Sequence, residues 1–175
     1  MKKYLIPTLL IILGLVSRLL PHPANFAPIG AIALFGALYL PKKWALILPI
    51  MAMFVSDIFI GFYSWQIMLC VYTSFALMGL IGLWVRKNKQ FSTVLGGTLL
   101  GSILFFLITN TAVWAFGTMY THNIPGLMQS YLMAIPFFKN SLLGDLFYVG
   151  LMVGGFEMVQ LAINKKEIVI DRTQI

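Results

Sequence analysis

Two acidic residues, Asp57 and Asp145, lie inside long apolar stretches of the chain. An ionisable side chain at membrane depth costs free energy, so such a residue usually faces a cavity or pairs with a partner. Under one interpretation the two carboxylates bind or orient a polar ligand. Under the other, each pairs with Arg18 or Lys139, or caps a helix, and only holds helices together. The sequence is consistent with both interpretations.

Cys70 is the only cysteine of the chain. At helical spacing it lies in one polar stripe with Gln66, Thr73 and Ser74. A thiolate on such a stripe is a soft ligand for a metal. A buried cysteine more often behaves as a small, inert apolar residue. Cys70 is therefore a candidate metal ligand, and a packing role is the alternative.

Other side chains that could contact a ligand fall toward the same side of the predicted membrane as the two acids. These candidates are His22, Asn25, Tyr63, Asn110, Trp114 and Tyr120. The polar ones would form hydrogen bonds, and the three aromatic ones would stack on a ligand. Aromatic residues near helix ends also form ordinary interfacial belts, which is the alternative. The two histidines and the cysteine lack the regular spacing of a zinc site.

The composition is that of an integral membrane protein. Hydrophobic residues make up 60% of the chain and charged residues 10%, and the mean hydropathy is +0.92. Soluble domains carry about 25% charged residues. The net charge of +7 comes from short basic clusters between apolar stretches. Such clusters set the orientation of membrane helices, so nucleic acid is not an expected partner, whereas membrane lipid is.

We expect a single all-α membrane domain over residues 1–175 with six transmembrane helices. Their ranges are 4–20, 27–40, 44–63, 66–85, 93–117 and 137–163. The second is short and rich in small residues, so it should pack against neighbours rather than lipid. Asn25 is a candidate cap for it. The segment 126–135 should lie along the membrane interface, and Glu157 should pair with Lys165 or Lys166.

Charge placement predicts the orientation of these helices. With the N-terminus inside, ten of the 12 basic residues fall on the inner side and only Arg18 and Lys139 fall outside. This bias places both termini in the cytoplasm of a multi-pass protein of the bacterial inner membrane. The polar candidates above then all fall in the outer half. A cavity that opens to the outside would explain why they gather there.

A specific resemblance rests on four stretches: 17–40 (SRLLPHPANFAPIGAIALFGALYL), Ser56-Asp57, 71–77, and 135–145 (IPFFKNSLLGD). Through them the chain resembles, over nearly all of its length, a family of small bacterial six-helix membrane proteins of undefined function. That family is similar to the S components of energy-coupling-factor (ECF) vitamin transporters. The resemblance implies capture of a micronutrient in an outward-facing pocket, with a shared energising ECF module as partner.

Solitary cobalamin-specific proteins of the S-component type place a cysteine beyond an intramembrane aspartate, and Asp57 and Cys70 are similar in arrangement. The resemblance implies that Cys70 is an axial ligand to the cobalt of bound cobalamin, since a thiolate suits that metal. Docking to an energising module uses a small-x-x-x-small motif on the first helix. That motif is not evident in Tyr4–Leu20, where Gly14 is the only glycine.

The sequence therefore predicts a substrate-binding membrane component for uptake of a small nutrient, with a vitamin, cobalamin first, as the substrate and no intrinsic cofactor. The alternative is a non-transporting membrane scaffold or assembly subunit. A membrane enzyme with Cys70 as nucleophile ranks last, because no histidine is predicted at the same depth to act as its base. Motifs for nucleotide binding or hydrolysis do not occur, so an enzymatic role is not expected.

Overall fold

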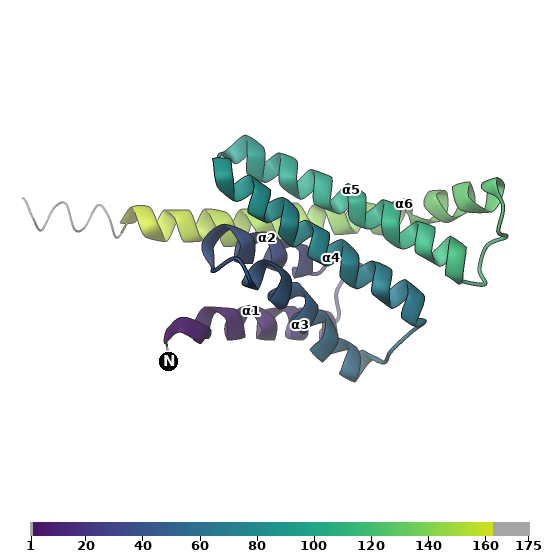
Figure 1. Cartoon of the computed structure of the whole chain (residues 1–175), viewed down its shortest axis with the longest axis horizontal. Coiled ribbons are helices and arrows are strands. Elements are labelled where there is room, and N and C mark those ends of the chain that lie inside the picture. Colours follow the sequence, from purple (N-terminus) through teal and green to yellow (C-terminus); the bar gives the residue numbers. More distant parts are fainter. Residues whose placement is uncertain (1, 163–175) are drawn as a thin grey trace, which may run out of the picture.

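The computed structural model describes residues 2–162, which form six α-helices and no β-strand (Figure 1). The helices are α1 (Lys2–Leu19), α2 (Ile29–Tyr39), α3 (Trp44–Ile60), α4 (Trp65–Val85), α5 (Phe91–Phe116) and α6 (Ile124–Val149). A short 3-10 helix, η1 (Arg86–Asn88), follows α4. After α6 the chain continues through a π-helical turn, η2 (Gly150–Gly154), and stays helical to residue 162. The all-helical class and the number of six helices are confirmed.

Successive helices run in opposite directions, so their connections gather at two ends of the bundle (Figure 1). The α2–α3 and α4–α5 connections lie at the end that also holds the N-terminus, and they carry Lys42, Lys43, Arg86, Lys87 and Lys89. The α1–α2, α3–α4 and α5–α6 connections lie at the opposite end. We refer to these as the basic end and the loop end.

Helix α2 is the centre of the bundle. Every residue from Ile29 to Leu38 is buried, as expected for a helix rich in small residues. Glycines on α4 allow this close packing: a Cβ on Gly82 would lie 2.6 Å from the Ala37 Cβ, and one on Gly79 would overlap the backbone carbonyl oxygen of Ala45 on α3. With 11 residues α2 is only about 16 Å long. It therefore leaves room at the loop end of the bundle.

Three helical stretches of the described chain are long and apolar enough to cross a membrane: 65–88, 91–116 and 124–162. The stretches 5–19, 29–39 and 44–60 are apolar but shorter. Large apolar side chains nevertheless face outward on α1 and α3, among them Leu9, Val16, Phe54 and Ile58. A soluble protein would present polar side chains there. Together these features indicate a membrane protein.

Helix α6 differs from the prediction. It begins at Ile124, so segment 126–135 is its first part and not a separate interfacial helix. The Asn123 side chain accepts a hydrogen bond from the Gly126 N–H at 2.9 Å and caps this start. Pro136 lies inside α6 without ending it. The first turns of α6 pack on α5. The buried Ser130 of α6 donates a hydrogen bond to the backbone carbonyl oxygen of Asn110 on α5.

Glu157 also has other partners than predicted. Its Oε1 lies 2.6 Å from Lys89 Nζ and accepts a hydrogen bond of 2.6 Å from the Tyr39 hydroxyl. Lys165 and Lys166 lie outside the described residues. The contact therefore joins the helical segment that follows η2 to α2 and to the η1–α5 connection at the basic end.

Candidate functional site

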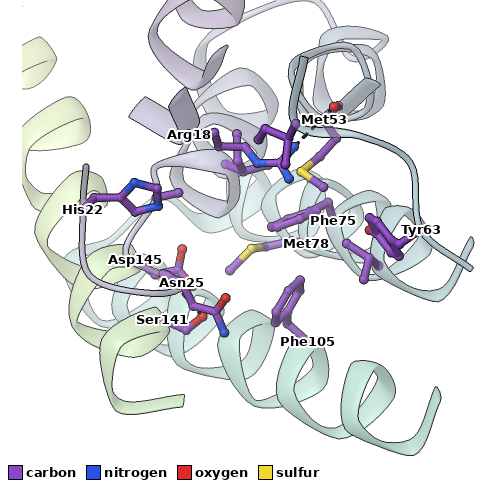
Figure 2. Close-up of a pocket in the computed structure, with 14 residues that line it drawn as sticks. Arg18, His22, Asn25, Met53, Tyr63, Phe75, Met78, Phe105, Ser141 and Asp145 are labelled. Carbon is purple, nitrogen blue, oxygen red and sulfur yellow. Dashed lines mark hydrogen bonds between the residues drawn. The ribbon is translucent and has the colours of Figure 1, made fainter. Parts of the chain in front are cut away.

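A cavity of about 320 Å³ lies beside the N-terminal end of α2, on the loop-end side of the bundle (Figure 2). The cavity exists because α2 is short. The space beyond the end of α2 is enclosed by the α1–α2 loop and by helices α3, α4, α5 and α6. The polar residues that line it are Arg18, His22, Asn25, Tyr63, Ser141 and Asp145. Figure 2 shows Arg18 on one side of this space and Asn25, Ser141 and Asp145 on the other.

Arg18 and Asp57 form a buried ion pair at one wall of the cavity. Arg18 Nη1 lies 2.8 Å from Asp57 Oδ1, and Asp57 is fully buried. The same Nη1 donates to the Met53 carbonyl oxygen at 3.3 Å and contacts the Ser56 hydroxyl. The Tyr72 hydroxyl donates to Asp57 Oδ2 at 2.8 Å. Asp57 is thus neutralised within the protein, and it lies behind Arg18 and does not line the cavity.

Asp145 has a different environment. The Ser102 hydroxyl donates to its Oδ2 at 2.7 Å, and no basic residue of the described chain lies within ion-pair distance. Its Oδ1 lies against Gly30 in the first turn of α2, so close that a Cβ on Gly30 would overlap it. The side chain lines the cavity and is 8% exposed. Asp145 is therefore a buried carboxylate without a counter-charge among the described residues.

The α1–α2 loop closes the cavity and is fixed to α6. Asn140 Nδ2 donates to the Ala24 carbonyl oxygen at 3.1 Å, and the Phe26 ring packs on Phe147 and Tyr148. Asn25 has a positive φ of 64°, a conformation that asparagine tolerates better than most residues. It does not cap α2 as predicted, because Pro28 occupies the N-cap position without a side-chain cap.

His22 in this loop has one ring nitrogen fixed and one free. Its Nδ1 lies 2.7 Å from the Leu20 carbonyl oxygen. A carbonyl oxygen only accepts, so Nδ1 carries the proton and Nε2 of the neutral ring is an acceptor. His22 therefore has a contact within its own loop and also lines the cavity, as expected for a ligand-contacting residue.

An apolar wall completes the cavity, with Val71, Phe75 and Met78 on α4 and Phe105 on α5. Tyr63 stands at its edge in the α3–α4 loop, because Gly61 (φ 106°) ends α3 earlier than predicted. Burial, and next the nearby Asp57 charge, raise the pKa of Tyr63 to about 12. Its hydroxyl therefore stays protonated at physiological pH and can donate a hydrogen bond.

A model described as a family of unknown function, DUF6580, matches residues 1–167. The chain belongs to this family. No curated protein and no solved structure matches it. Nothing in these comparisons supports the resemblance of this DUF6580 protein to ECF S components or to cobalamin-binding proteins, and that resemblance stays a prediction.

In this DUF6580 protein Cys70 lies apart from the two acids. It lines an open, apolar surface groove with Leu107, Ile108 and Ala112 of α5. Its chain neighbour Val71 lines the cavity, and successive helical residues point about 100° apart. The described residues contain no group of three or more His, Cys, Asp or Glu side chains that could hold a metal ion.

The remaining predicted residues lie nearer the α5–α6 loop and outside the lining of the cavity. Asn110 lines a smaller neighbouring cavity of about 250 Å³, which shares Asn25, Val71, Phe105 and Ser141 with the first. Trp114 donates through Nε1 to the Thr121 carbonyl oxygen at 3.0 Å. Tyr120 lies in the α5–α6 loop. The structure therefore brings together His22, Asn25, Tyr63 and Asp145 and leaves Trp114 and Tyr120 outside.

Sequence reasoning did not find Tyr72 and Ser102, the two hydroxyl groups that bond to the acids. A signal for each was present, since both are polar residues inside apolar helical stretches. The sequence also left open which of the two acids pairs with Arg18. The structure shows that Arg18 pairs with Asp57 and that Lys139 pairs with neither acid.

Proposed function

We propose that this protein is a multi-pass protein of the bacterial inner membrane that binds a small nutrient in the cavity beside α2, as the substrate-binding component of an uptake system. The observation that carries the proposal is the cavity itself, where Arg18 and Asp145 face a shared space from opposite sides. Buried charges are costly in a membrane protein and usually mark a ligand or ion site.

The position of the cavity supports capture from outside the cell. It lies toward the loop end, away from Lys42, Lys43, Arg86, Lys87 and Lys89. Basic residues favour the cytoplasmic side, and with that orientation the cavity would lie in the outer half of the membrane. Uptake needs energy that this sequence cannot supply from nucleotides, so we propose an energising partner protein or an ion gradient as its source.

The size of the cavity favours a ligand smaller than cobalamin. Ligand pockets for drug-sized molecules span about 300–1,000 Å³, and this cavity lies at the low end with about 320 Å³. Cobalamin, with its corrin ring and nucleotide loop, is larger than a drug-sized molecule. Cys70, the proposed cobalt ligand, lines a different groove. We therefore propose a compact nutrient as the ligand, with no metal ligation by Cys70.

The scaffold alternative is favoured by one observation, the Arg18–Asp57 pair, which satisfies its charges within the protein as structural contacts do. A scaffold would give no reason for Asp145 to line a cavity without a counter-charge. Nutrient binding accounts for both features, because the ion pair then shapes one wall of the site.

The test is to fill the cavity. Ser141 lines it, so Ser141→Leu should abolish retention of a co-purified small molecule, detected by mass spectrometry of the denatured protein. Ser92→Leu is the matched control, because Ser92 is exposed at the start of α5. Equal retention by both variants would exclude this cavity as the binding site. A wild-type protein that retains no small molecule and binds none in solution would favour the scaffold.

A further inference from the structure

We infer that the ligand is a small organic cation, whose ammonium group binds Asp145 and whose other end accepts hydrogen bonds from Arg18. This inference rests on the proposed binding function and adds the chemical class of the ligand. It follows from three features of the cavity: its net charge, its free hydrogen-bonding atoms and its apolar wall.

The charges around the cavity do not balance. Arg18 and Asp57 cancel each other at 2.8 Å, which leaves Asp145 as the acidic residue that lines the cavity without an ionic partner among the described residues. The charge of a buried carboxylate without a counter-charge is costly, so such a group either takes up a proton or binds a cation. A ligand with a single positive charge would remove this cost, whereas an anionic ligand would increase it. The balance therefore favours a cation over a neutral molecule or an anion.

Two acceptors on the Asp145 side are free, and the Asn25 side-chain amide beside them can both donate and accept. Ser102 occupies Oδ2 of Asp145, and Oδ1 has no hydrogen-bond partner in the described part of the chain. The Nε2 atom of His22 is a second acceptor, because Nδ1 donates to Leu20. An ammonium group carries up to three N–H donors and no acceptor, so it complements such a set.

The free atoms on the Arg18 side are donors. Every hydrogen bond and ion pair of the guanidinium with described residues is made by Nη1, which leaves the N–H groups of Nε and Nη2 free to donate to a ligand. The positive charge is already paired with Asp57, so a neutral acceptor such as a hydroxyl or carbonyl oxygen is sufficient at this end. Phe75, Met78 and Phe105 line the space between and favour an apolar middle part. The aromatic faces also attract a cation.

Three probes of matched shape test the class: 2-phenylethylamine, 2-phenylethanol and 3-phenylpropionate. Binding to the full-length protein in detergent would be measured by calorimetry. The amine and the alcohol can both donate a hydrogen bond to Asp145, but only the ammonium group supplies a counter-charge to the buried carboxylate. The amine should therefore bind at least about tenfold more tightly than the alcohol, and the carboxylate should bind most weakly. Tyramine, which adds a hydroxyl group at the far end, should bind more tightly than 2-phenylethylamine.

Asp145→Asn keeps the shape of the side chain and an acceptor for Ser102, and should abolish the preference for the amine. Glu157→Gln is the matched control, because it removes one acid from the same long helix, outside this cavity. It should leave the preference unchanged. Thermal unfolding of both variants checks that they are folded; should Asp145→Asn fail to fold, the wild-type ranking of the three probes decides alone.

The outcomes separate the ligand class from the proposed function. If the alcohol or the carboxylate binds as tightly as the amine, the cationic class is wrong, while small-molecule binding stands. If the amine preference persists in Asp145→Asn, Asp145 is not the recognition group and the inference fails. If none of the probes binds and no small molecule co-purifies with the protein, both the inference and the proposed function are overturned.

Discussion

At the scale of residues, Asp57 and Asp145 have different partners. The Asp57 carboxylate contacts Arg18 and Tyr72 and is closed off from the cavity. Asp145 accepts a hydrogen bond from Ser102 and lines the cavity. Each of the two interpretations offered by the sequence thus describes one of the acids. Asp57 has the contacts of a structural residue, and Asp145 has those of a candidate ligand-binding residue.

Breaking the Arg18–Asp57 pair should destabilise the protein strongly. Removing one partner of a buried ion pair costs about 3–5 kcal/mol, because the other charge stays buried and unpaired. We expect this loss for Arg18→Met and for Asp57→Asn, with a much smaller combined loss in the double variant. The measurement is the free energy of unfolding in detergent. Losses that simply add would contradict a direct coupling between the two residues.

The second ion pair of the described chain, Lys89–Glu157, is a suitable control. Its two side chains are 38% and 42% exposed, against 17% and 0% for Arg18 and Asp57. Exposed pairs contribute about 0–1 kcal/mol. Glu157→Gln should therefore change the free energy of unfolding by no more than this amount.

The sequence predicts which residues belong to the site better than it predicts which residues they contact. Polar residues in apolar stretches are visible in any sequence, which is why His22, Asn25, Tyr63 and Asp145 could be named. The rotation of each helix about its axis is not visible when apolar residues surround it. Cys70 and Val71 are adjacent in the chain, yet the cavity is lined by Val71. A difference of one residue thus decided which of them could contact a ligand.

At the scale of elements, the short and fully buried α2 determines where the cavity lies. Glycines on α4 bring α2 and α3 close enough to exclude space along the helix, and the cavity opens only beyond its N-terminal end. The small-residue content of α2 predicted this packing correctly. The start of α6 was not predictable in the same way, because a proline often ends a helix. Here Asn123 caps the helix and contacts with α5 hold its first turns, so Pro136 is accommodated.

Gly79 gives a test of this packing. Its neighbour is the backbone carbonyl of Ala45, which cannot move aside as a flexible side chain could. Overpacking costs about 1–3 kcal/mol or more, so Gly79→Ala should lower the free energy of unfolding by at least this amount. Gly96 on α5 is the matched control, since nothing lies within 4 Å of a Cβ placed there. Gly96→Ala should be neutral or stabilise by up to about 1 kcal/mol. Equal effects at both sites would contradict the close approach of α3 and α4.

At the scale of the whole molecule, charge and cavity occupy opposite ends. Basic residues gather in the α2–α3 and α4–α5 connections, which lie at one end of the bundle (Figure 1). The cavity lies toward the loops at the other end. This separation predicts a direction for the molecule across a membrane. The proposed capture of a nutrient from outside depends on that direction, because the same cavity facing the cytoplasm would suit release and not uptake.

Cysteine labelling tests the direction. In a Cys70→Ser background, which removes the only native cysteine, one new cysteine is introduced at a time. Met119→Cys places it in the α5–α6 loop, where Met119 is 74% exposed, and Lys87→Cys places it in the exposed η1 segment at the basic end. In spheroplasts, a membrane-impermeant maleimide should label Met119→Cys at once and Lys87→Cys only after lysis, because basic connections stay in the cytoplasm.

The Cys70→Ser protein without a new cysteine should stay unlabelled and gives the background. The reverse pattern would place the cavity in the inner half of the membrane, and capture from outside would then be wrong whatever the ligand.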